Sequence, residues 1–202
     1  MPYTDATISN MALGHIGVQG YISSLANDKS NEARQCRLFY AHARDTILEM
    51  MSWPFATVRA ELQLQGTAYD GWTYSYAYPN DCAFASAIVL PGMRTPPTDK
   101  KVPFRIVKNP DQQGKLIMTD QESAVLEYNQ KIEDPALFDA TFAQAVSLFL
   151  ATLIGGPLRC DPGLLKKKEA EFQAWQAEAG TKGLREQKED EIPDSEFVSV
   201  RS

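Results

Sequence analysis

Hydrophobic residues recur every three or four positions in four stretches of the chain, which is the spacing of one face of a helix. The pattern predicts helices over residues 5–16, 30–52, 135–154 and 162–179. Ser30 and Asp134 can cap the starts of the second and third helices, and Gly17 follows the first. The third stretch is apolar nearly all round, so we expect it to be the central helix.

Between the second and third stretches the period changes to two, which is the alternation of a half-buried strand. Residues 56–64 alternate in this way, and a second run places Trp72, Tyr74 and Tyr76 on one face. Shorter strand patterns, separated by turn residues, follow at 87–90, 104–107, 115–119 and 124–129. The sequence therefore predicts a small antiparallel β-unit over about residues 55–132, inserted between two pairs of helices.

These elements together predict an α+β fold: a four-helix bundle core, the inserted β-unit and an extended C-terminal tail. Residues 1–180 are predicted to form a single domain, because a chain of 202 residues fills one core rather than two. Beyond Gly180 the chain is polar and has little to bury. Residues 181–202 are therefore predicted to be an arm that stays flexible until it binds a partner.

The end of this arm carries a small apolar cluster after a run of acidic residues. Its hydrophobic members are Ile192, Phe197, Val198 and Val200. A segment of this kind orders by adding a strand to another chain or by filling a groove on it. A frayed terminus with incidental hydrophobic residues is the alternative.

The charge balance argues against several classes of function. The chain has 20 Lys and Arg against 26 Asp and Glu, a net charge of −6, whereas proteins that read DNA sequence usually present a basic face. The most apolar stretch, 142–154, is shorter than the roughly 20 residues that a membrane span needs, and the first residues lack the pattern of a secretion signal. We expect neither sequence-specific nucleic-acid binding nor membrane contact. The three separated cysteines favour a reducing compartment.

Few residue patterns point to catalysis. The two histidines and three cysteines lack the spacing of a metal site, and no glycine-rich phosphate loop follows a strand. Cys36 and His42 share a helix but lie on different faces of it. We therefore predict no catalytic, cofactor or metal site. A glycosidase would need two converging carboxylates, for example Glu61 with Asp81, and no motif pairs them.

Two further groups have both a functional and a structural interpretation. The run of Lys166, Lys167 and Lys168 either meets phosphate groups or forms a solvated helix face, which is the commoner case next to Glu169. The aromatic strand from Trp72 to Tyr78 either stacks on a ligand or packs in a core or a protein interface.

Several short motifs, all in about the first 85 residues, are similar to those of one protein family. They are Asn10-Met11-Ala12-Leu13, Asn31-Glu32-Ala33-Arg34, Trp53-Pro54-Phe55-Ala56, Arg59-Ala60-Glu61-Leu62 and Tyr78-Pro79-Asn80-Asp81-Cys82. In this combination the chain resembles the head-to-tail adaptor proteins of short-tailed bacteriophages, the tail tubular protein A family. Ala83-Phe84 is a departure, since many members have Leu-Arg there.

The resemblance implies a structural virion protein that is not an enzyme and needs no cofactor. Such adaptors form a twelve-fold ring under the portal protein, extend the channel through which DNA leaves, and carry the tail nozzle protein. The protein would be made in the host bacterial cytoplasm and located in the virion tail, at the portal vertex. Many such adaptors are monomers until they meet the portal, so the free protein would be a monomer that joins the ring on assembly.

The same resemblance suggests roles for particular residues. The arm residues Ile192, Phe197, Val198 and Val200 would bind the portal. The aromatic residues Trp72, Tyr74 and Tyr76 would contact the nozzle or a neighbouring subunit, and Lys166, Lys167 and Lys168 would lie on the channel or a subunit surface. Twelve copies would carry a total charge of 12 × −6, about −72, which favours a channel that does not hold DNA. A tail-associated enzyme that degrades cell wall and a binding module unrelated to phages are the alternatives.

Overall fold

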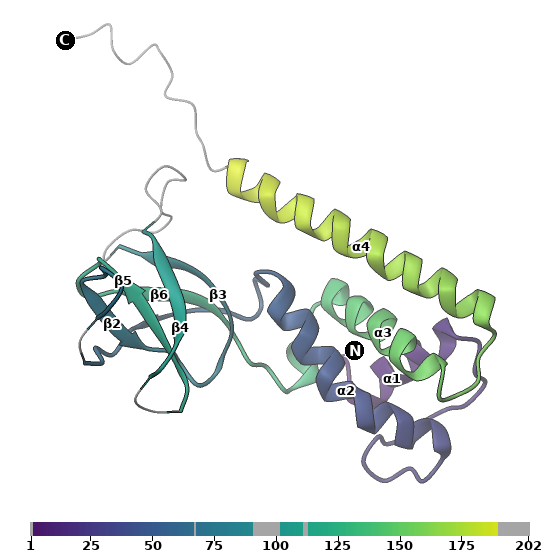
Figure 1. Cartoon of the computed structure of the whole chain (residues 1–202). Helices are drawn as coiled ribbons and strands as arrows, with labels where there is room; N and C mark the ends of the chain where they lie inside the picture. The colour runs from purple at the N-terminus through teal and green to yellow at the C-terminus, as the bar shows by residue number, and fades with distance from the viewer. Residues whose placement is uncertain (1, 67, 91–101, 111–112, 190–202) are drawn as a thin grey trace, which may run out of the picture. The chain divides into compact units, whose positions relative to one another are not determined.

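The computed structural model of the chain describes residues 2–66, 68–90, 102–110 and 113–189, with side chains as far as residue 178. These residues form helices and strands in the order α1 (Asp5–His15), α2 (Asn31–Met50), β1 (Thr57–Glu61), β2 (Tyr74–Ala77), β3 (Cys82–Val89), β4 (Phe104–Lys108), β5 (Lys115–Thr119), β6 (Val125–Gln130), α3 (Ala140–Gly155) and α4 (Pro162–Glu189) (Figure 1). A short 3-10 helix, η2 (Pro135–Leu137), precedes α3.

The described residues group into two compact units. The first is formed mainly by residues 2–58, 81–85 and 128–178 and contains α1, α2 and α3. The second is formed mainly by residues 59–80 and 86–127 and contains most of the strand residues. The single domain that the sequence predicts for residues 1–180 stays a prediction.

The core of the first unit is built on α3. Asp139 caps its start by accepting a hydrogen bond from the Phe142 amide at 2.7 Å. Phe142, Leu150 and Ile154 of α3 are fully buried, in agreement with a stretch that is apolar all round. Helices α1 and α2 cover it with narrower apolar stripes, and Ile8 of α1 and Ile47 of α2 are also fully buried.

The predicted four-helix bundle core is wrong. The chain is α+β, but its helices do not make such a bundle, and two three-stranded antiparallel sheets account for a substantial part of the fold. The physical reason lies in α4, because Phe172 is its one buried side chain between Pro162 and Glu178. A bundle helix needs an apolar stripe along its whole length. Helix α4 has a short one and lies on the surface of the unit formed by α1, α2 and α3.

A buried asparagine closes the C-terminal end of α2. The Asn129 side chain accepts a hydrogen bond from the Trp53 amide at 3.0 Å and donates to the carbonyl groups of Leu48 and Met51. The Trp53 indole also donates to the Ile47 carbonyl at 2.9 Å. These bonds satisfy carbonyl groups that the last turn of a helix leaves without partners.

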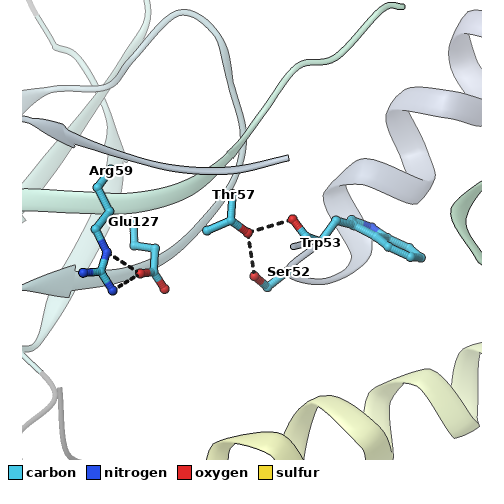
Figure 2. A network of polar contacts seen from close by, with 5 residues as sticks. All are labelled: Ser52, Trp53, Thr57, Arg59 and Glu127. Carbon is cyan, nitrogen blue, oxygen red and sulfur yellow. Dashed lines mark hydrogen bonds and ion pairs between the residues drawn. The ribbon is translucent and has the colours of Figure 1, made fainter. Parts of the chain in front are cut away.

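After this corner the chain enters β1, and hydrogen bonds link the first residue of β1 to the turn before it. Figure 2 shows the Thr57 side chain directed at the Trp53 carbonyl, to which its hydroxyl donates at 2.7 Å, with the Ser52 hydroxyl 3.3 Å away. In the second unit, Arg59 of β1 forms an ion pair with Glu127 of β6, with 2.6 Å between Nη2 and Oε2 (Figure 2). This pair is partly exposed, so its contribution to stability is small.

The six strands form a ring of antiparallel pairs. One sheet has the order β1-β6-β3 and the other has the order β2-β5-β4. A bridge between Leu64, just after β1, and Tyr76 joins the sheets along one side. On the other side a single bridge joins Ile88 of β3 to Val102, just before β4. The strands that the sequence predicts are present, and β3 is longer than predicted because it begins at Cys82.

Candidate functional site

One face of the β2-β5-β4 sheet collects aromatic, aliphatic and cationic side chains. Its register places them in three rows: Tyr74, Thr119 and Phe104, then Tyr76, Ile117 and Ile106, and finally Tyr78, Lys115 and Lys108. The middle strand is buried at Ile117 and Thr119, whereas Ile106 at the edge is 40% exposed. This sheet face therefore runs from a packed centre to an accessible edge on β4.

The aromatic strand residues divide between packing and partial exposure. Tyr76 is buried, and its hydroxyl donates to the Gln121 carbonyl at 2.9 Å. Trp72 and Tyr74 are half-buried, and the Tyr74 ring lies 6.3 Å from that of Tyr76. Tyr76 is thus a structural residue, and of the three aromatic residues only Trp72 and Tyr74 are partly exposed.

Two lysines that the sequence analysis did not single out lie opposite each other in this sheet. Lys108 of β4 and Lys115 of β5 are register partners, and both are exposed. The Lys115 ammonium group lies 5.2 Å from the centre of the Tyr78 ring, which attracts the positive charge. Like charges placed directly opposite each other destabilise a strand pair, and neither lysine has an ion pair among the described residues.

The three consecutive lysines of α4 do not form one patch. Lys166 and Lys167 are exposed, whereas Lys168 is half-buried and its ammonium group donates to Glu171 at 2.8 Å. Both partners of this pair lie near His15 of α1. Lys168 therefore has a structural partner, and of the three lysines only Lys166 and Lys167 are exposed.

His15 makes the one histidine to serine contact found among the described residues. Its Nε2 lies 3.2 Å from the Ser147 hydroxyl of α3. That hydroxyl donates to the Gln144 carbonyl at 2.8 Å, so it accepts rather than donates toward the histidine. Ser147 is also fully buried. This is not the geometry of an activated nucleophile, which gives its proton to the base.

The local environment favours the neutral form of His15. Burial lowers the pKa of His15, the nearby Lys168 charge lowers it further, and Glu171 opposes both. A neutral imidazole suits a position between two helices because it needs no counter-charge.

The carboxylates considered for a glycosidase have other partners. Asp81 accepts one hydrogen bond from the Tyr128 hydroxyl at 3.1 Å and another from the Gln130 amide at 2.9 Å. Burial, followed by the charge of Asp81, raises the pKa of Tyr128 to about 12. Glu61 lies exposed at the end of β1. Asp81 therefore holds β6 beside the start of β3, which is a structural role.

A ring stack fastens α4 to the first unit. Trp175 stacks on Trp53 with 6.3 Å between ring centres and on its own neighbour Phe172 at 5.9 Å. Phe172 in turn stacks on Phe149 of α3 at 4.8 Å. Aromatic pairs of this kind add roughly 0.5–1.5 kcal/mol each to the burial of their area.

No known protein family matches the chain. Comparison with curated proteins likewise finds no match. The resemblance of the short motifs to the adaptor family stays a prediction.

The structure does not describe the predicted portal-binding residues of the arm. The arm residues Ile192, Phe197, Val198 and Val200 lie outside the described residues. In the part of the chain that the structure describes, no three His, Cys, Asp or Glu side chains are grouped as metal ligands. Its helices include none that is long and apolar enough to cross a membrane.

Proposed function

We propose that this chain is a structural virion protein, a head-to-tail adaptor that joins the portal protein to the tail nozzle protein of a short-tailed bacteriophage. Twelve copies would form a ring that extends the DNA channel. The motif resemblance of the first 85 residues supports this proposal, and so does the arrangement of the C-terminal part of the chain.

The observation that carries the proposal is the packing of the first part of α4, between Pro162 and Glu178, together with the composition of the segment that follows the helix. Its first part is fastened by Phe172 and Trp175, while most other side chains up to Glu178 are exposed. The helix continues to Glu189, and the segment that follows it in the sequence has four acidic residues between positions 190 and 196 and an apolar end. A segment of this composition is suited to bind a partner by adding a strand to it or by filling a groove on it.

The surfaces assigned to the other partners follow from exposure. Trp72 and Tyr74, half-buried beside the buried Tyr76, would contact the nozzle or a neighbouring subunit. Lys166 and Lys167 would lie on the channel or a subunit surface, where a few lysines remain compatible with a net charge of −6 per chain. An acidic wall holds DNA weakly because phosphates find little counter-charge on it.

Removal of residues 189–202 tests the role of the arm. We expect the truncated chain to lose most of its binding to portal rings in a sedimentation assay. Its thermal unfolding should change little, because a polar terminal segment with few apolar residues contributes little to a core. A full-length variant with serine at Ile192, Phe197, Val198 and Val200 should behave in the same way.

Matched changes at the arm's own polar positions serve as the control. Ser195→Ala and Ser199→Ala keep the length and the apolar cluster and should bind portal rings normally. If the truncated chain binds portal rings as well as the full-length chain, the arm is not the portal-binding segment. A marked fall in its melting temperature would assign the arm to the fold instead.

A further inference from the structure

The side of the strand ring between β3 and β4 is held weakly. Only the bridge from Ile88 to Val102 joins it among the described residues, whereas the side between Leu64 and Tyr76 also has backbone hydrogen bonds, from Gln65 to Ser75 and from Ala77 to Gln63. Strand β4 is an edge strand beyond Val102. An unpaired strand edge is a template for a further strand.

The backbone of β4 shows which of its groups face this edge. The Asn109 amide donates to the Gly114 carbonyl at 3.0 Å, so residue 109 and, by alternation, residues 107 and 105 direct their backbone groups toward β5. Phe104, Ile106 and Lys108 therefore direct theirs outward. The Lys108 carbonyl agrees with this, because it accepts a hydrogen bond from the Tyr69 hydroxyl at 3.2 Å rather than from β5.

The side chains along this edge have a definite order of chemistry. Phe104 is half-buried, Ile106 is 40% exposed and Lys108 is exposed, with Lys115 of β5 as its register partner. A strand that fits this edge presents two apolar residues and then an acidic one, each two positions apart. The acidic group also relieves the repulsion between the two lysines.

The chain contains a segment with this order near its own C-terminus. In an antiparallel alignment Val200 lies opposite Phe104, Val198 opposite Ile106 and Glu196 opposite Lys108. On the other face of the same alignment Phe197 meets Val107 and Ser199 meets Arg105. A parallel alignment instead places the Glu196 carboxylate opposite the apolar Phe104. An antiparallel alignment shifted by two residues places it opposite the apolar Ile106. The match of side chains therefore favours one register.

We propose that residues 196–200 of one copy of this chain add an antiparallel strand to the β4 edge of a second copy. The Glu196 amide then takes the place of the Tyr69 hydroxyl on the Lys108 carbonyl. Such a contact is heterologous, because arm and edge are different surfaces, and heterologous contacts generate rings or open chains of subunits. This inference rests on the proposed function in one respect, because only there do the paired copies form a ring. The pairing itself needs no portal. A portal would compete with the β4 edge for the same arm.

Disulfide trapping tests the register in the full-length chain. One protein carries Ile106→Cys and the other carries Val198→Cys, both with Cys160→Ser, because Cys160 is the one native cysteine that is not buried. Opposed residues of this kind have Cα atoms about 5.5 Å apart, which suits a disulfide. We expect mild oxidation of the mixture to give a disulfide-linked dimer.

The matched control is Ser199→Cys in place of Val198→Cys. It moves the thiol by one residue to the opposite face of the added strand, so its dimer should form at least about fivefold more slowly. Equal rates with both partners, or no dimer with either, would overturn the proposal. A disulfide within one chain that carries both cysteines, without dimers from the mixture, would also overturn it by assigning the edge to the chain's own arm.

Reversing the charges at Lys108 and Glu196 tests whether the trapped disulfide comes from this specific pairing or from random collisions. Adding Lys108→Glu to the edge partner should slow trapping about fivefold, the equivalent of roughly 1 kcal/mol for a cross-strand charge pair. Adding Glu196→Lys to the other partner should restore the rate, while Lys29→Glu, at an exposed lysine just before α2, should leave it unchanged. Failure of the reversed pair to recover would contradict the register. The assay contains no portal, so its failure and the failure of the adaptor proposal are distinguishable.

Discussion

At the scale of single residues, Asn129 has the largest structural task that we identify. Its fully buried amide binds the end of α2 through Leu48 and Met51 and holds the Trp53 amide at the turn that follows. Removing the side chain leaves several buried backbone groups without partners, and each such group costs about 1–3 kcal/mol.

We therefore expect Asn129→Ala to lower the free energy of unfolding by about 3 kcal/mol. Urea denaturation followed by tryptophan fluorescence measures this directly, because Trp53 lies at the affected corner. The control is Asn27→Ala in an exposed loop, which should change stability by less than about 0.5 kcal/mol. Similar effects of the two changes would contradict the assigned role.

His15 gives the fold a dependence on pH with a definite sign. Its pKa is lowered from 6.5 in the folded chain, so the unfolded chain binds the proton more readily. The stability that comes from the neutral imidazole is complete above 6.5 and is lost as pH falls through the lower folded pKa.

The wild-type protein should accordingly lose stability between about pH 7.5 and about pH 5.5, a range that leaves most carboxylates charged. His15→Gln removes the titrating group, so its urea midpoint should fall less over the same range. An equal fall in both proteins would show that the pH dependence originates elsewhere.

The candidate site shows what residue patterns predict and what they miss. Alternation predicts that Trp72, Tyr74 and Tyr76 share a strand face, but only the sheet reveals that Tyr76 is buried while its neighbours are half-exposed. The pairing of Lys108 with Lys115 is absent from any local pattern, because it depends on register. Pro110 and Gly114 mark the turn between them, and counting outward from that turn is the signal that finds the pair.

At the scale of elements, α3 and α4 approach each other closely where α3 ends. A Cβ atom on Gly155 would lie 2.6 Å from Cδ1 of Leu165 and 3.2 Å from the Cys160 sulfur, whereas one on Gly156 would meet nothing within 4 Å. The two adjacent glycines therefore differ in what they permit, although both are near the same helix end.

Gly155→Ala should lower the free energy of unfolding by about 1–2 kcal/mol through overpacking against α4. Gly156→Ala, its matched control, should leave stability unchanged or raise it by up to about 1 kcal/mol, because alanine restricts the unfolded chain. Urea denaturation of both variants gives the comparison. Equal values would mean that α4 does not pack at Gly155.

The elements themselves are predictable to a large extent, because their signals are local. The Ser30 cap and the stripe that includes Cys36 and Ile47 predict α2 almost to its boundaries. The prediction of a four-helix bundle is wrong because periodicity shows that one face of a helix is apolar. It does not show how much of that face is covered by other helices. The buried Phe172 and the half-buried Trp175 give α4 an apolar stripe of only about one turn, enough for a surface helix and too short for a bundle member.

At the scale of the whole molecule, the effect of the net charge of −6 depends on whether the chain is alone or assembled. For a single chain it argues against sequence-specific DNA binding. In the proposed ring of twelve it would add up to a collective field around the passing DNA. The adaptor proposal depends on that assembly, so its decisive test is a view of the assembled state.

Electron microscopy of portal rings mixed with the purified chain provides that view, using the portal protein encoded in the same genome. The account predicts that each portal ring gains a second tier with twelve-fold symmetry, and that the chain without residues 189–202 adds far fewer such tiers. Portal rings that remain single-tiered at every concentration of the full-length chain would contradict the adaptor proposal.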